Sequence, residues 1–230
     1  MSKKSTRIIK GHKHIQYQPL TFPEEQMIKR ASDFYEMADR RRSIREFSDK
    51  PVPREIMLDI IRTAGTSPSG ANKQPWTFCL VSDPTIKKQI RDAAEEEEYQ
   101  SYHNRMSQEW LKDLEPMGTV WEKPFIETAP WLIVAFRKIY DMDEKGQKTN
   151  NYYVTESIGL ACGMLLVAIH NAGLSALTHT PSPMNFLSKI LDRPENERPF
   201  LLIPVGYTAD EIFVPDIKRK KLDDICVIYE

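Results

Sequence analysis

An arginine cluster is the first feature of this sequence that could do chemistry. Four arginines fall within six positions, in the segment Arg40-Arg41-Arg42-Ser43-Ile44-Arg45. Guanidinium groups are planar and permanently charged, and they hold a phosphate monoester through paired hydrogen bonds. The cluster therefore predicts a phosphate clamp, although a basic run at a helix end is also typical of a solvated surface.

A second basic cluster, Lys218-Arg219-Lys220-Lys221, lies near the other end of the chain. Two remote segments often hold the phosphate of one cofactor, whereas a single cluster is typical of a surface patch. Neither Gly-x-Gly-x-x-Gly nor Gly-x-x-x-x-Gly-Lys-Ser occurs, so the usual loops for dinucleotides and nucleoside triphosphates are absent. A bound phosphate would belong to a smaller molecule, such as a mononucleotide.

The segments that must position these clusters alternate between helix and strand patterns. Apolar spacing, prolines and caps predict five helices: Glu24–Arg40, Pro53 to about Gly65, Asp83-Pro84 to the acidic run Glu95–Glu98, Tyr152–Asn171, and a short helix from Ser182-Pro183. Apolar and β-branched runs predict three strands: Trp76–Val81, Pro130–Phe136 and Phe200–Val205. This order predicts one α/β or α+β domain with a central sheet covered by helices.

A turn-forming segment and an apolar helix add two further expectations. The sequence PSGANKQP at 68–75 consists of turn residues and feeds directly into a predicted strand, which is a natural place for a site. The helix at 152–171 is apolar on nearly every side, as is typical of a domain centre or a subunit interface. Its run Ile158–Ile169 is shorter than the roughly 20 residues that cross a bilayer, so no membrane anchor is expected.

The composition favours a cytoplasmic protein whose function resides in a local site. With 32 basic and 33 acidic residues, the net charge of -1 gives no general attraction to nucleic acid or anionic lipid. Cys79, Cys162 and Cys226 form no Cys-x-x-Cys pair, which predicts buried thiols in a reducing compartment. Residues 1–22 predict a flexible tail without a secretory signal, and we expect no metal site, although His12 and His14 could bind a metal ion as a pair.

Two motifs resemble the nitroreductase-type flavoproteins. R-R-S-I-R followed by S-P-S-G-A-x-x-Q-P-W is similar to their opening signature, and N-A-G-L, L-x-x-P-V-G-Y and V-P-D-x-K-R-K extend the resemblance to the C-terminus. The resemblance implies an α+β, nitroreductase-like fold over residues 23–230, with a central mixed, mainly antiparallel sheet flanked by helices. It also implies an intertwined homodimer. The apolar residues of a C-terminal extension, about 215–230, predict that this extension docks on the partner subunit.

The same resemblance implies FMN as the cofactor. The arginine segment would hold its phosphate and ribityl chain, and the Pro-Ser-Gly turn would lie against the isoalloxazine ring from the neighbouring subunit. Thr180 would donate to flavin N5 as the catalytic contact, which favours transfer of single electrons; His179 interrupts the run of threonines expected there. The implied FMN-binding residues are Arg41, Arg42, Ser43, Ile44, Arg45, Pro68, Ser69, Gly70, Thr178, His179, Thr180 and Arg219.

Within the superfamily, E-E-E-E-Y-Q-S-Y and W-E-K resemble the substrate lid of the iodotyrosine deiodinases, here at about 95–125. The resemblance implies that Glu98, Tyr102 and Lys123 grip the amino acid zwitterion, and that the Ala71 N–H meets the substrate phenolate. Glu98 and Tyr102 are four residues apart and share a helix face, so both can reach an ammonium group. Taken singly, Glu98 and Lys123 are typical of a solvated surface.

The expected activity is reductive removal of iodide from mono- and diiodotyrosine, with electrons from an NAD(P)H-linked reductase or a similar donor. A broad nitroreductase or quinone reductase is the first alternative, because it would share every FMN contact without needing the zwitterion-binding residues. The second alternative is a protein that binds flavin or a halophenol without turnover.

Overall fold

The computed structural model describes residues 5–230, and the chain forms two compact units whose boundary in the sequence lies between Arg40 and Arg41. The first unit contains a β-hairpin of β1 (Thr6–Ile9) and β2 (His12–Ile15), followed by helix α1 (Glu24–Asp39). The hairpin lies where the sequence predicted a flexible tail; residues 1–4 of that tail lie outside the described residues. The helix agrees with its prediction.

A four-stranded antiparallel sheet forms the centre of the second unit. Its order is β3-β4-β8-β7. The strands are β3 (Trp76–Val81), β4 (Trp131–Lys138), β8 (Glu197–Gly206) and β7 (Ser175–Ala176). The segment from Ser43 to Phe47 extends this sheet through a parallel bridge from Ser43 to Ala176 and an antiparallel bridge from Phe47 to Thr208. The predicted mixed, mainly antiparallel sheet is therefore confirmed.

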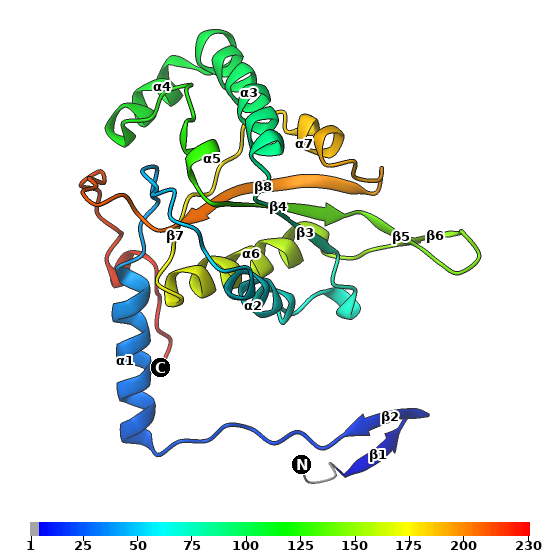
Figure 1. Ribbon diagram of the computed structural model, residues 1–230. Coiled ribbons are helices and arrows are strands. Elements are labelled where there is room, and N and C mark those ends of the chain that lie inside the picture. The colour runs from blue at the N-terminus through cyan, green and yellow to red at the C-terminus, as the bar shows by residue number, and fades with distance from the viewer. Residues whose placement is uncertain (1–4) are drawn as a thin grey trace. The chain divides into compact units, whose positions relative to one another are not determined.

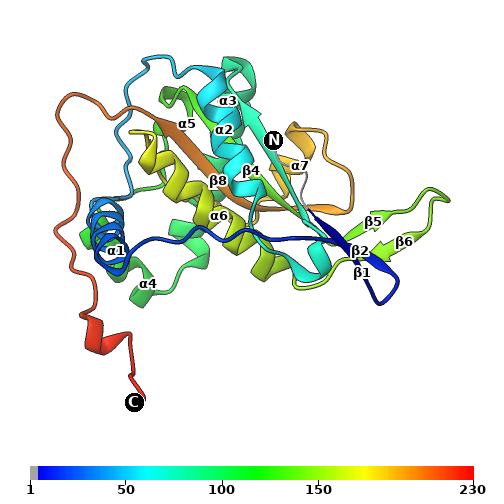
Figure 2. The ribbon, with the colours of Figure 1, turned by 90° about the horizontal axis from the view of Figure 1, so that it is seen from below.

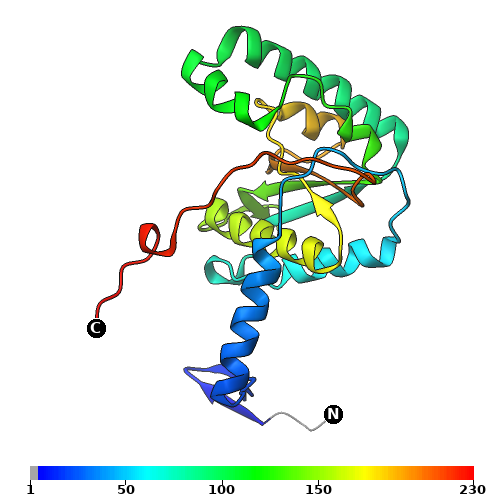
Figure 3. The ribbon, with the colours of Figure 1, turned by 90° about the vertical axis from the view of Figure 1, so that its left-hand side faces the viewer.

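Helices cover both faces of the sheet (Figure 1). One face carries α2 (Arg54–Gly65) and α6 (Val154–Asn171), which pack against each other and lie in front of the sheet in Figure 2, where the molecule is seen from below. The other face carries α3 (Pro84–Gln100), α5 (Phe125–Thr128) and α7 (Asn185–Ile190), and Figure 3 shows the two layers from the side. The remaining elements are α4 (Gln108–Leu114), the hairpin β5 (Tyr140–Met142) and β6 (Lys148–Asn150), and the short turns η1 (Gly70–Asn72), η2 (Ser101–Arg105), η3 (Glu115–Met117) and η4 (Leu222–Asp224).

The alternation of side chains along β4 explains the two layers. Leu132, Val134 and Phe136 pack into the core with α3, α5 and α7, whereas Ile133 packs into the core with α2 and α6. Successive side chains of a strand point to opposite faces, so an uninterrupted apolar strand belongs between two helical layers. The site residues described below lie at the edge of this sheet and on the α3 side.

Helix starts follow the predicted signals. The Asp83 carboxylate accepts a hydrogen bond from the Ile86 amide at 2.9 Å and caps α3, whose first residue is Pro84. The short helix α7 begins at Asn185, later than the predicted start at Ser182.

Helix α6 buries one face and exposes the other. Ile158, Cys162 and Leu165 are buried, whereas the Leu160 side chain is 54% exposed. Among residues 5–230, α6 alone is long and apolar enough to cross a membrane by length and composition, a test that core helices of soluble proteins also pass.

The three cysteines differ in burial. Burial raises the pKa of Cys162 to about 12 and also raises the pKa of the half-buried Cys79, so neither thiol ionises near neutral pH. The prediction that all three are buried is wrong for Cys226, because the C-terminal segment that carries it is exposed throughout.

Candidate functional site

The arginine segment forms an extended edge beside β7. The Ile44 amide donates to the Ala176 carbonyl at 3.1 Å, and the buried Ile44 side chain fixes the segment to the core. The Arg42 guanidinium donates to the Pro215 carbonyl, and the Arg219 guanidinium donates to the Arg41 carbonyl at 2.9 Å. The two basic clusters, remote in sequence, thus lie together.

Between these clusters is a cationic pocket of about 190 Å³. Its lining includes four guanidinium groups and one ammonium group. The lining residues are Arg41, Arg42, Ser43, Arg45, Met117, Pro215, Ile217, Lys218 and Arg219. Such a concentration of permanent positive charge suits a phosphate group. The predicted role of these residues in binding FMN stays a prediction.

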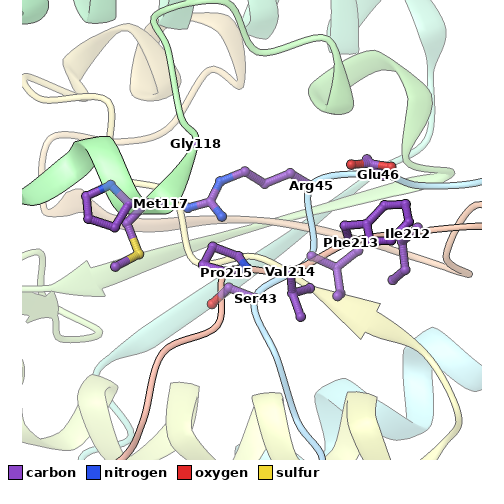
Figure 4. A pocket seen from close by; sticks show the side chains of 11 residues that line it. Ser43, Arg45, Glu46, Met117, Gly118, Ile212, Phe213, Val214 and Pro215 are labelled. Carbon is purple, nitrogen blue, oxygen red and sulfur yellow. The ribbon is translucent and has the colours of Figure 1, made fainter.

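An adjoining pocket of about 270 Å³ connects the arginine segment to the lid (Figure 4). Figure 4 shows Arg45 extending from its edge segment toward Met117 and Gly118, while Phe213 and Val214 lie on the other side. Gly118 ends η3 with a φ of 58°, a left-handed conformation that glycine adopts without strain. Arg45 therefore lies between the cationic pocket and the lid.

A third, polar pocket of about 240 Å³ lies against the segment that is predicted to form a lid. Its residues come from the arginine segment, the end of α3, the π-helical turn η2 and the residue after it, α4, the loop before α5, the first residue of α5 and the segment after β7. They are Arg45, Glu98, Tyr102, Met106, Trp110, Leu114, Thr119, Lys123, Phe125, Leu177, Thr178, His179 and Thr180. π-Helical turns are rare and often occur at functional sites, and this one carries Tyr102.

The three residues predicted to grip a zwitterion meet in this polar pocket. The Lys123 ammonium lies 3.2 Å from the Glu98 carboxylate, and their side chains are only 3% and 10% exposed. The Tyr102 hydroxyl donates to the Thr119 carbonyl at 3.3 Å, and the Lys123 ammonium is 5.3 Å from the centre of the Tyr102 ring. The alternative interpretation of Glu98 and Lys123 as solvated surface residues is wrong.

Burial opposes both charges of the Glu98–Lys123 pair. It raises the pKa of Glu98 and lowers the pKa of Lys123, while the attraction between the two groups counteracts each shift. Burial also raises the pKa of Tyr102, so its hydroxyl keeps its proton. A buried carboxylate and a buried ammonium each need a partner. A ligand bearing both charges could supply a new partner to each.

The segment after β7 presents alternate side chains to opposite sides. Thr178 and Thr180 are exposed, whereas Leu177 and His179 are buried. The segment pairs with β8, since the His179 amide donates to the Leu202 carbonyl at 2.8 Å and the Leu202 amide donates back at 3.0 Å. The two threonine hydroxyls are therefore separated from the imidazole, which lies next to Glu98.

The predicted residues Pro68, Ser69, Gly70 and Ala71 are not brought to these pockets. None of them lines the three pockets described above. They lie instead at the start of α6, where a Cβ on Gly70 would come within 3.0 Å of the Tyr152 carbonyl. This close approach explains the glycine, and Ala71 has a left-handed φ of 49°.

Glu95 holds the backbone at Lys123, a role that the sequence did not predict. Its carboxylate accepts hydrogen bonds from the Lys123 amide at 2.6 Å and from the Arg91 guanidinium at 2.7 Å. The four-residue spacing of Arg91 and Glu95 is a signal for their ion pair. Nothing in the sequence indicates the contact to a backbone amide 28 residues away.

Comparisons with known proteins identify the family of this chain. Residues 38–207 match the nitroreductase family. The chain is 59% identical to iodotyrosine deiodinase of Haliscomenobacter hydrossis, over 94% of this chain and 97% of the relative. It is 45% identical to iodotyrosine deiodinase 1 of Homo sapiens, over 93% of this chain and 74% of the relative.

A solved structure resembles the fold as well. It is an oxidized iodotyrosine deiodinase bound to FMN and 3-iodo-L-tyrosine, with a TM-score of 0.72 and 31% identity over 86% of this chain and 98% of that chain. From the family match and the identity to nearly whole relatives, we conclude that this chain belongs to the nitroreductase family, in its iodotyrosine deiodinase branch.

Proposed function

We propose that this protein catalyses the FMN-dependent reductive removal of iodide from mono- and diiodotyrosine, leaving tyrosine. The observation that carries the proposal is the buried group of Glu98, Tyr102 and Lys123 beside a cationic pocket. A nitroaromatic or quinone substrate has no zwitterion, so it would not require this group. The identity to iodotyrosine deiodinases supports the same reaction.

The cationic pocket fits the phosphate of FMN. Arg41, Arg42 and Arg219 would bind its oxygens, with Ser43 beside them. When bound, FMN supplies the electrons that reduce the carbon–halogen bond. The Thr180 hydroxyl, exposed on the opposite side of its segment from His179, is the group that we assign to flavin N5.

The polar pocket would bind the amino acid end of the substrate by exchange of ion-pair partners. Glu98 would take the substrate ammonium, Lys123 would take its carboxylate, and the Tyr102 hydroxyl would add a hydrogen bond. The internal ion pair then keeps both charges compensated before the substrate arrives. Binding at this end orients the halophenol ring, and enclosure by the lid excludes water from it.

The remaining half of the site would come from a second copy of the chain in a homodimer. The turn with Ala71, which we assign to the substrate phenolate, lies apart from the polar pocket in one chain. The exposed Leu160 of α6 and the apolar residues of the C-terminal extension are suited to contact a partner subunit. Those residues are Ile217, Leu222, Ile225, Val227, Ile228 and Tyr229, each more than half exposed.

We further propose that the protein works in the cytoplasm and receives its electrons from an NAD(P)H-linked reductase or a similar donor. Three cysteines without a disulfide among them are compatible with a reducing compartment.

The proposal is tested by anaerobic titration of the purified flavoprotein with 3-iodotyrosine. We expect flavin fluorescence to be quenched on binding and iodide to be released after reduction with dithionite. A yellow protein that does not respond to iodotyrosine would contradict the deiodinase function and favour a general nitroreductase, whereas binding without iodide release would favour a binding protein.

The substitution Glu98→Gln distinguishes a deiodinase function from a general nitroreductase function. It removes the negative charge that would hold the ammonium while retaining the size of the side chain. We expect iodotyrosine to bind about 10- to 100-fold more weakly, which corresponds to loss of one charged hydrogen bond. Turnover of a nitroaromatic should be nearly unchanged, and it serves as the control for an intact FMN site.

A further inference from the structure

A buried histidine in the polar pocket, His179, is counted among the FMN-binding residues by resemblance alone, and the proposed function gives its imidazole no task. The His179 side chain is 9% exposed, and its Nε2 has no hydrogen-bond partner among residues 5–230. The ring is held in a T-shaped contact with Phe125, with ring centres 5.7 Å apart, and its backbone is fixed by the bridge to Leu202. Buried polar atoms almost always have a partner, so an unpaired one suggests a function.

The position of Nε2 identifies the missing partner. It lies 3.9 Å from Oε1 of Glu98, while Oε2 of the same carboxylate lies 3.2 Å from the Lys123 ammonium. The two oxygens of Glu98 thus face different groups. The first distance is about 1 Å too long for a hydrogen bond, so a small shift of either side chain would form one.

The electrostatic surroundings fix the form of the imidazole. Burial, together with the positive charges of Lys123 and Arg45, lowers the pKa of His179 to about 3, so the ring is neutral. A neutral imidazole carries one hydrogen, and placing it on Nε2 turns a donor, rather than a lone pair, toward the carboxylate. A neutral donor can hold Glu98 without competing with a substrate ammonium for its charge.

We propose that His179 is a positioning residue for Glu98, whose Nε2–H donates to Oε1 when a substrate ammonium replaces Lys123 at Oε2. This inference rests on the proposed function. In the exchange, Lys123 turns to the substrate carboxylate, and the charge of Glu98 then depends on the substrate ammonium in place of Lys123. Because burial favours the protonated form of Glu98, a donor at Oε1 preserves the ionised carboxylate that the ammonium needs.

Two substitutions and two ligands test the proposal. His179→Leu removes the donor, and His179→Gln is the matched control because its amide nitrogen can occupy the place of Nε2. The ligands are 3-iodotyrosine and 3-(3-iodo-4-hydroxyphenyl)propanoate, which lacks the ammonium. Binding to the FMN-loaded protein is followed by flavin fluorescence.

We expect His179→Leu to weaken the binding of iodotyrosine about tenfold, as for loss of a hydrogen bond to a charged group. His179→Gln should retain most of the wild-type affinity. Binding of the propanoate should change by less than about twofold, since only the ammonium depends on the charge of Glu98. An equal loss for both ligands would mean that His179 merely shapes the pocket, and no loss for either would equally overturn the proposal.

Failure of the proposed function would be visible separately, as wild-type protein that does not bind iodotyrosine. In that case the interaction itself is tested in a Lys123→Met background, where Glu98 lacks its ion-pair partner, by carbon NMR titration of the Glu98 carboxyl in protein labelled at glutamate. We expect a higher pKa for Glu98 in His179→Leu than in His179→Gln, because only glutamine offers a donor to the ionised form. Equal pKa values in the two variants would refute the pairing.

Discussion

The neutral imidazole of His179 should make the stability of this protein depend on pH, and His179→Gln should remove that dependence. In the folded protein, burial and the charges of Lys123 and Arg45 lower the pKa of His179 to about 3, whereas its ordinary value is 6.5. Between these two values the unfolded chain binds a proton that the folded chain does not. Stability contributed by the neutral ring is therefore present above pH 6.5 and is lost as the pH falls toward 3.

The size of the effect between pH 7 and pH 5 follows from the ordinary pKa. Each pH unit below 6.5 lowers the free energy of unfolding by about 1.4 kcal/mol. Between pH 7 and pH 5 the wild type therefore loses about 2 kcal/mol relative to a variant whose residue 179 does not titrate. The result is nearly the same for any folded pKa below about 4, because at pH 5 the folded ring is then still neutral.

Urea unfolding of the FMN-loaded wild type and His179→Gln, at pH 7 and pH 5 and at one protein concentration, measures this difference. All other titrating groups are common to both proteins and cancel in the comparison. From pH 7 to pH 5, we expect the free energy of unfolding of the wild type to fall by about 2 kcal/mol more than that of the variant. Equal losses would show that His179 is protonated or solvated in the fold. If the variant does not fold, the imidazole proton resonances of wild-type His179 should show no titration between pH 7.5 and pH 5.

Other predictions concern the cofactor, the substrate and the core. Arg219→Ala should weaken the binding of FMN about 10- to 100-fold, as measured by equilibrium dialysis, since one charged contact to the phosphate is lost. The affinity for iodotyrosine should fall as the pH is lowered toward the raised pKa of Glu98, because only the ionised carboxylate holds the ammonium. Calorimetry measures this decrease, which should be absent in Glu98→Gln. Thr77→Val should destabilise the protein by about 1–3 kcal/mol in urea, because the buried Glu197 carboxylate loses a hydrogen bond of 2.6 Å; an unchanged midpoint would contradict this.

The long elements of the second unit could be predicted because their signals are local. The proline before α2 and the apolar face of that helix, the Asp83 cap of α3 and the aromatic and β-branched residues of β3 are all signals from neighbours in sequence. β7 has only two residues and gives no periodicity to detect, although it anchors the arginine segment. The β1–β2 hairpin could not be predicted from the sequence, because a basic composition such as that of its residues is also typical of flexible tails.

The chemistry of the site was more predictable than its burial. Charge and residue type indicated that the arginine segment and the Lys218–Lys221 cluster could share a phosphate, and the structure brings them together. Glu98 lies in a run of four glutamates, where composition alone indicates solvent exposure. Its burial arises because the segment at 119–123 folds back over α3, a contact between elements that no local pattern encodes.

Arg45 links the two halves of the candidate site electrostatically. It lines both the cationic pocket and the polar pocket, and its positive charge contributes to the lowered pKa values of Lys123 and His179. A phosphate held in the cationic pocket would offset part of that charge, because electrostatic effects are weakly screened in a partly buried site. Lys123 would then keep its own proton more firmly and bind a substrate carboxylate better. The positive charge of Arg45 would thus help to attract the cofactor, and its neutralisation by the bound phosphate would favour the protonated Lys123 that binds the substrate carboxylate.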